Sequence, residues 1–152
     1  MNKKELLHII SKGECEQTEF KENFGKQVIE TIVAFANTKG GNIFIGIKDN
    51  KQVSGIMLNS ETLQNWHNQI KLSTQPSMFT DIELFEIENK TIAHIQVNEF
   101  PVKPISVKGK YFKRIKNSNH QMNLTEISDE HLKTINSSWD FYIDPNNTLK
   151  SI

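Results

Sequence analysis

The sequence predicts an α+β fold, with a mixed and mostly antiparallel sheet of about five to six strands and about two to three packed helices. Residues 42–49 form an almost continuous β-branched and aromatic run, which is typical of a central strand. Alternating apolar residues over 81–88 and 91–97 predict a hairpin with one polar face. Apolar residues at helical spacing over 26–36 predict a helix that packs on the sheet.

Weaker patterns complete the first two thirds of the chain. Residues 3–11 predict a short amphipathic helix, and the alternation at 17–21 predicts a short strand. Residues 52–56 are expected to return antiparallel to the central strand after a turn. Ser60 is the expected N-cap of a helix over 61–72.

The last third contains a second hairpin and a polar end. Residues 105–115 predict a short hairpin, and Thr125 is the expected N-cap of a short helix. Residues 136–152 are polar and lack periodicity, which is typical of a linker. We therefore expect one domain over 1–128, followed over 129–152 by a helix and linker that lead to a further domain.

Composition narrows the class of protein. The hydrophobic fraction of 36% and the charged fraction of 24% fit a soluble globular domain. No apolar run approaches the roughly 20 residues of a membrane helix, and residues 1–5 do not begin a secretory signal. Cys15 is the only cysteine, which excludes an intrachain disulfide. These features predict a cytoplasmic protein without a membrane partner.

The formal net charge is zero, but the charges are unevenly distributed. Residues 1–100 hold ten lysines and thirteen acids, whereas residues 101–125 hold six cations and no acid. We call 108–116 the basic arm, because its cations can contact phosphates while an aromatic ring stacks on an unpaired base. The candidate nucleic-acid-binding residues are Lys108, Lys110, Tyr111, Lys113, Arg114 and Lys116.

Two alternatives stay open for the basic arm. An edge strand can be rich in lysine simply because charge prevents aggregation, and an exposed hairpin can pair with a second copy in a homodimer. Arg114 is the only arginine of the chain. Its guanidinium can hold a phosphate in a bidentate fork, or it can pair with a structural carboxylate.

A longer pattern joins these elements. Glu19-Phe20-Lys21 lies on the first strand, and the segment 34–41 reads Ala-Phe-Ala-Asn-Thr-Lys-Gly-Gly. Ile45-Gly46-Ile47 then ends the central strand, and Gly55 follows shortly after. This pattern resembles the Schlafen AlbA-like domain family, and Tyr111 to Arg114 resembles the family's Y-x-R strand. The resemblance runs from about Glu5 to Ile127.

The resemblance implies an α+β fold that binds DNA or RNA, often in the N-terminal part of bacterial transcriptional regulators. Members have also been described as divergent ATPases. A P-loop needs glycines that lead into Lys-Ser/Thr at the start of a helix. Here Gly40 and Gly41 end a helix and begin a strand, and the chain has no Gly-Lys-Ser/Thr. The sequence therefore favours a tight turn with positive φ over an ATP site.

The same resemblance raises an enzymatic alternative to simple binding. Some eukaryotic Schlafen proteins cleave structured RNA with two glutamates and an aspartate, which would correspond here to Glu14, Glu19 and Asp49. Three converging carboxylates could hold Mg²⁺ or Mn²⁺ and activate water, and Lys21 could neutralise the developing charge. These four residues are the candidate catalytic residues of a metal-dependent endoribonuclease. The glutamates can equally be exposed polar residues beside a strand, and a domain that only binds is the preferred interpretation.

Overall fold

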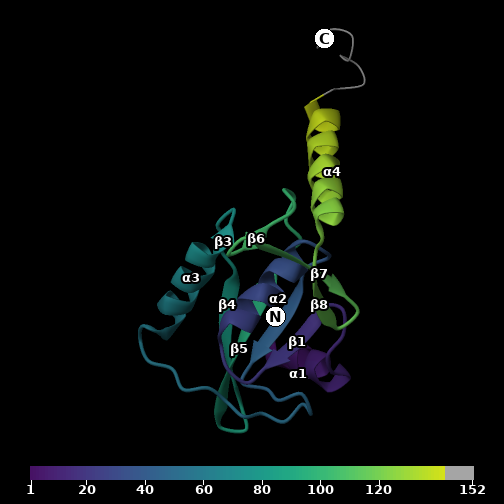
Figure 1. The fold of residues 1–152 in the computed structure, drawn as a ribbon. Helices are drawn as coiled ribbons and strands as arrows, with labels where there is room; N and C mark the ends of the chain where they lie inside the picture. Colours follow the sequence, from purple (N-terminus) through teal and green to yellow (C-terminus); the bar gives the residue numbers. More distant parts are fainter. Residues whose placement is uncertain (143–152) are drawn as a thin grey trace.

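The computed structural model of the protein describes residues 1–142, and the α+β class is confirmed. In chain order the elements are α1 (Lys3–Lys12), β1 (Thr18–Lys21), α2 (Lys26–Ala36), β2 (Gly41–Ile45), α3 (Thr62–Ser73), β3 (Thr74–Gln75), β4 (Asp81–Ile87), β5 (Lys90–Val97), β6 (Ser106–Val107), β7 (Lys110–Ile115), β8 (Ser118–Gln121) and α4 (Leu124–Tyr142). The strands form two four-stranded sheets, in the orders β1-β2-β5-β4 and β3-β6-β7-β8 (Figure 1).

The first sheet is mixed and mostly antiparallel, as predicted. β1 pairs parallel with β2, which places Phe20 opposite Phe44, whereas β2 pairs antiparallel with β5. β4 and β5 form the predicted hairpin. Residues 43–47 at and beyond the end of β2 are all buried, in keeping with a central strand covered on both faces.

Helix α2 lies between the two sheets, because it contacts β2 and β5 on one side and β6, β7 and β8 on the other. Eight of its eleven residues are buried, including Thr31. A helix that is apolar nearly all round must be covered on nearly all sides, and the second sheet supplies the missing cover. Helix α1 packs on the opposite face of the first sheet, where Leu6 and Ile10 join Phe20 and Phe44 in a second core cluster.

The glycine turn between α2 and β2 has a steric cause. Gly40 has φ +74°, and a Cβ at this position would lie 2.5 Å from the carbonyl oxygen of Val97. A Cβ at Gly41 would lie 2.9 Å from both the Gln17 carbonyl oxygen and the Phe35 ring. The predicted positive φ is confirmed for Gly40, and Gly41 is required by space instead.

The structure corrects two local predictions in the first half of the chain. Residues 52–56 form a loop with one bridge between Ile47 and Val53, because Gly46 and Gly55 both have positive φ and interrupt a regular ladder. At the start of α3 it is Asn59 whose side chain accepts the Glu61 N–H, at 2.9 Å, in place of the predicted cap at Ser60.

Helix α4 is longer than the sequence predicts. Asn123 and Glu126 cap each other's backbone N–H groups at 2.9 and 3.2 Å, so the helix begins at this capping box and not at Thr125. It continues to Tyr142, through part of the segment predicted as a linker and across the expected boundary at 128/129. Residues 143–152 of that segment lie outside the described residues. None of the described helices is long and apolar enough to span a membrane.

Replacing Gly40 by alanine should destabilise the fold by about 2 to 5 kcal/mol, as the sum of left-handed backbone strain and overpacking against Val97. Gly109→Ala is the matched control, because Gly109 has φ +79° but a Cβ at this position would have nothing within 4 Å, so only about 1 to 2 kcal/mol of strain should be lost. Urea denaturation measures both. Equal losses would show that the approach of Val97 does not restrict this turn.

Candidate nucleic-acid interface

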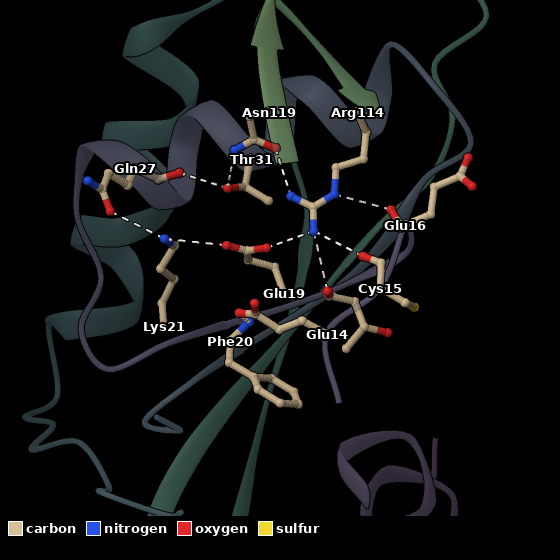
Figure 2. A network of polar contacts seen from close by, with 11 residues as sticks. Glu14, Cys15, Glu16, Glu19, Phe20, Lys21, Gln27, Thr31, Arg114 and Asn119 are labelled. Atoms are coloured by element: carbon tan, nitrogen blue, oxygen red, sulfur yellow. Dashed lines mark hydrogen bonds and ion pairs between the residues drawn. The ribbon is translucent and has the colours of Figure 1, made fainter. Parts of the chain in front are cut away.

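Arg114 of β7 lies in the interior of the protein and not on the surface of the basic arm. Its side chain is 1% exposed, and its Nη2 atom lies 2.7 Å from Oε2 of Glu19 on β1 (Figure 2). The guanidinium also lies over the Phe35 ring, 4.9 Å from the ring centroid. β1 and β7 belong to different sheets, so this ion pair joins the two sheets beside α2.

Backbone carbonyls complete the partners of the guanidinium. Nη2 donates to the Cys15 and Thr18 oxygens at 3.0 and 3.4 Å, and Nε donates to the Glu16 oxygen at 3.3 Å. Nη1 donates to the side chain of Asn119 at 2.8 Å. Burying a charge is costly unless it is paired and hydrogen-bonded, and here every guanidinium nitrogen has an acceptor. A buried guanidinium with these partners is not available to a phosphate, so the predicted phosphate contact by Arg114 does not fit the structure. The alternative prediction, a structural carboxylate as the partner of Arg114, is met by Glu19.

The ion pair is part of a closed ring of polar contacts (Figure 2). Lys21 Nζ lies 3.4 Å from Glu19 Oε1 and donates to Gln27 Oε1 at 3.2 Å. Thr31 Oγ1 donates to the Gln27 carbonyl at 2.9 Å and accepts from Asn119 at 2.9 Å. In order, the ring contains Glu19, Lys21, Gln27, Thr31, Asn119 and Arg114. It connects β1, α2, β7 and β8, and we call it the Arg114 ring.

A second clamp holds the same sheet at the C-terminal end of α2. The Asn37 amide donates to the carbonyls of Ile105 and Phe112, both at 2.9 Å, and accepts the Ile105 N–H at 2.7 Å. Thr38 Oγ1 accepts the Arg114 backbone N–H at 2.9 Å. Sequence reasoning missed both roles. The sequence signal that could have indicated these roles is the position of Asn37 and Thr38, two polar residues that directly follow an apolar helix and precede the glycine turn.

The three candidate metal-ligating carboxylates lie in one region without forming a ligand set. Both oxygens of Glu19 face cations, Arg114 and Lys21, and Asp49 is exposed. Within residues 1–142 no group of three or more histidine, cysteine, aspartate or glutamate side chains is arranged to hold a metal ion. The residues present therefore do not fit the expected Mg²⁺ or Mn²⁺ site. Lys21 is brought to Glu19, where it neutralises this carboxylate.

Glu14 has the most perturbed environment of the three. Its Oε1 accepts the Phe20 N–H at 3.0 Å. Partial burial raises the pKa of Glu14 above its ordinary value of 4.5, and the charges of Glu19 and Asp49 raise it further, against the lowering effects of the Phe20 N–H and Lys21. Glu14 is thus held close to other acids, in a place where its charged form is disfavoured.

The basic arm retains three exposed lysines, Lys108, Lys110 and Lys116. Within the described part of the chain no carboxylate lies within ion-pair distance of them, whereas Lys113 pairs with Glu126 of α4. Tyr111 is half-buried. Of the six residues predicted to contact nucleic acid, three are therefore exposed lysines without an acidic partner in the described part of the chain. The other three are a paired lysine, a buried arginine and a half-buried tyrosine.

One further lysine joins the arm from a distant part of the sequence. Lys108, at the turn between β6 and β7, and Lys26, at the start of α2, line the same hollow of about 100 Å³. Both are exposed. Sequence reasoning missed Lys26, since it stands alone in a mixed segment and only the fold brings it to the basic arm.

Comparison with known proteins agrees with this arrangement of two sheets around a central helix. The sequence profile of the Schlafen AlbA_2 family matches residues 14–123. The chain belongs to this family. No curated protein matches the chain significantly.

Two solved structures share the fold. The DIP2311 protein from Corynebacterium diphtheriae superposes with a TM-score of 0.62 at 15% identity, over 76% of this chain and 23% of that one. This chain therefore spans less than a quarter of that protein. The N-terminal domain of a protein from Nitrosomonas europaea that is described as related to the ATP-dependent DNA helicase RecG superposes with a TM-score of 0.56 at 23% identity, over 79% of this chain and 92% of that domain.

Breaking the ion pair should destabilise the fold strongly, because either partner alone would remain buried and under-compensated. We expect Arg114→Met and Glu19→Gln each to lower the free energy of unfolding by about 3 to 5 kcal/mol. The double variant should lose less than the sum, because the two residues share one interaction. Urea denaturation of all three, with Lys116→Ala as an exposed control within about 0.5 kcal/mol of the parent, measures the coupling. Additive losses would contradict it.

The raised pKa of Glu14 sets a direction for the pH dependence of stability. The folded protein keeps this proton to a higher pH than the unfolded chain, so the stability that Glu14 contributes falls as pH rises above about 4.5 and levels off beyond the folded-state pKa. Glu14→Gln keeps an oxygen that can accept the Phe20 N–H and removes the charge. Its stability relative to the parent, measured by urea denaturation, should therefore increase from pH 4.5 toward neutrality. Glu22→Gln, at an exposed acid of the next loop, controls for the loss of one charge. A difference that stays constant with pH would contradict the expected shift.

Proposed function

We propose that this domain binds DNA or RNA through the phosphate backbone, by means of the exposed lysines of the basic arm and of α2. The observation that carries the proposal is the presence of three exposed lysines at and beyond the two ends of β7, without acidic partners among the described residues. Lys26 extends this surface across the turn at Lys108. Membership of the Schlafen AlbA_2 family and the likeness to a domain of a helicase-related protein support the same kind of partner.

The spacing of the lysines suits a linear polyanion. Lys110 and Lys116 stand six residues apart on or just beyond β7, which is about 20 Å at the rise of a strand. Double-stranded DNA advances about 3.4 Å per base pair, so this length corresponds to about six base pairs. Lysine contacts of this kind position a protein on the backbone and do not identify bases.

A setting for this activity follows from the family resemblance. We propose that the domain supplies the DNA- or RNA-binding part of a transcriptional regulator that acts in the cytoplasm. In such a protein the backbone contacts described above would hold the regulator on nucleic acid, and other residues would provide selectivity.

Removing the three free lysines should weaken binding and its dependence on salt. For Lys108→Ala with Lys110→Ala and Lys116→Ala, we expect the slope of log affinity against log salt to become shallower by roughly 2 to 3, because each lost contact releases about 0.9 fewer counterions. Fluorescence anisotropy with labelled duplex DNA and with structured RNA, between about 50 and 200 mM salt, measures the slope.

The matched control carries the same change of charge on the far side of the first sheet. Lys3, Lys4 and Lys12 of α1 are all exposed, and their triple alanine variant should keep the parent slope. If both triple variants lose affinity equally, net charge and not the basic arm governs binding. If the parent binds neither nucleic acid at low salt, the proposed function is wrong.

A further inference from the structure

A hollow of about 420 Å³ lies between β3, β6, β7 and the first turns of α4. These elements meet at the end of the molecule from which α4 projects (Figure 1). The rings of Tyr111 and His131 line the hollow, together with the apolar side chains of Pro76, Pro104 and Ile127. Its volume falls in the range of about 300 to 1,000 Å³ that is usual for small-molecule sites.

The walls of the hollow are held in place by contacts that join α4 to β7 and to the segment before β6. Lys113 of β7 pairs with Glu126 in the first turn of α4. Thr134 Oγ1 accepts the Lys103 backbone N–H at 3.1 Å and donates to the Lys103 carbonyl at 3.0 Å. α4 is thus fixed to the body at two points on either side of His131. A ligand would enter a largely preformed site and would spend little free energy on ordering it.

The chemistry of the lining indicates a flat, uncharged group next to a negative charge. Two aromatic rings and the proline walls offer surfaces for stacking, and the Ser128 hydroxyl can bond to a polar edge. Among the described residues, no aspartate or glutamate lines the hollow. Lys103, which also pairs with Glu99, is the cation of the lining.

We propose that this hollow receives one unpaired base of a single-stranded nucleic acid, while Lys103 in its wall contacts the phosphate beside that base. The inference rests on the proposed function and adds to it a preference for single-stranded over double-stranded nucleic acid. Lysine contacts alone bind any polyanion, whereas a base pocket makes binding depend on an unstacked base.

The test compares three labelled ligands with the same number of phosphates: a single strand, the same strand with one central abasic site, and a duplex. The full chain should bind the intact strand roughly tenfold more tightly than the abasic strand, which is the order of effect of one stacked base. A 2-aminopurine at the central position should lose fluorescence on binding, as stacked bases do.

Four variants locate the effect. Tyr111→Ala and His131→Ala should each abolish the preference for the intact strand and leave binding to the duplex unchanged, whereas Tyr111→Phe should keep the preference. Phe79→Ala, which removes a 72% exposed ring elsewhere on the molecule, should also keep it. His131 is exposed on α4, so its variant remains informative if Tyr111→Ala does not fold.

The outcomes separate this inference from the proposed function. Equal affinity for the intact and abasic strands, with salt-dependent binding of both, would overturn the base pocket alone. A preference that survives Tyr111→Ala and His131→Ala would overturn it as well, since the base would then lie elsewhere. No binding of any of the three ligands at low salt would overturn both proposals. Binding of a proline-rich peptide that is lost in Tyr111→Ala, without any preference between strands, would assign the hollow to a protein partner instead.

Discussion

The buried pair between Arg114 and Glu19 fixes how the two sheets sit on α2. Hydrophobic packing alone would hold the second sheet against the helix but would not set its position along the helix. A charged group without partners in this interior would be costly, so the strands must lie where the guanidinium reaches Glu19 and the carbonyls of residues 15, 16 and 18. β7 is thereby placed, and with it the lysines at and beyond its two ends.

The residues that carry the resemblance to the family have structural roles in this protein. Glu19 and Arg114 form the ion pair, Asn37 clamps the second sheet, and Gly40 makes the turn into β2. The pairing of Glu19 with Arg114 and Lys21 also explains why Glu14, Glu19 and Asp49 are not arranged as a ligand set in the described part of the chain. The lysines proposed to bind nucleic acid are not among the residues that carry the family resemblance. Their positions nevertheless depend on those residues, because the ion pair and the Asn37 clamp place β7.

Local patterns were sufficient for the elements whose cause is local. The run at 42–49 predicted β2, the spacing at 26–36 predicted α2, and two alternating segments predicted the hairpin of β4 and β5. The division into two sheets was not predictable in this way, since it depends on contacts between residues far apart in sequence. The start of α4 depends on the reciprocal cap of Asn123 and Glu126, and its continuation to Tyr142 runs through a polar segment in which no periodicity indicates a helix.

The residues of the candidate site show the same contrast between features with a local cause and features that depend on long-range contacts. Lys108, Lys110 and Lys116 could be found from sequence, because an exposed turn and a strand end are local features. The burial of Arg114 could not, since an arginine among lysines has the sequence context of a surface residue. Its being the only arginine was the one signal, and that signal fitted a phosphate and a carboxylate equally well. Lys26 and His131 entered only when the fold placed them beside the arm.

The ion pair also has a consequence for the order in which the chain is made. Glu19 leaves the ribosome 95 residues before Arg114, so β1 and β2 can pair while the acid still faces water and one side of α2 is uncovered. Contacts between such distant residues form slowly, because the loop between them must close first. During synthesis the unfinished domain therefore exposes apolar helix surface until residue 114 emerges, and in this interval it is open to chaperones and to aggregation.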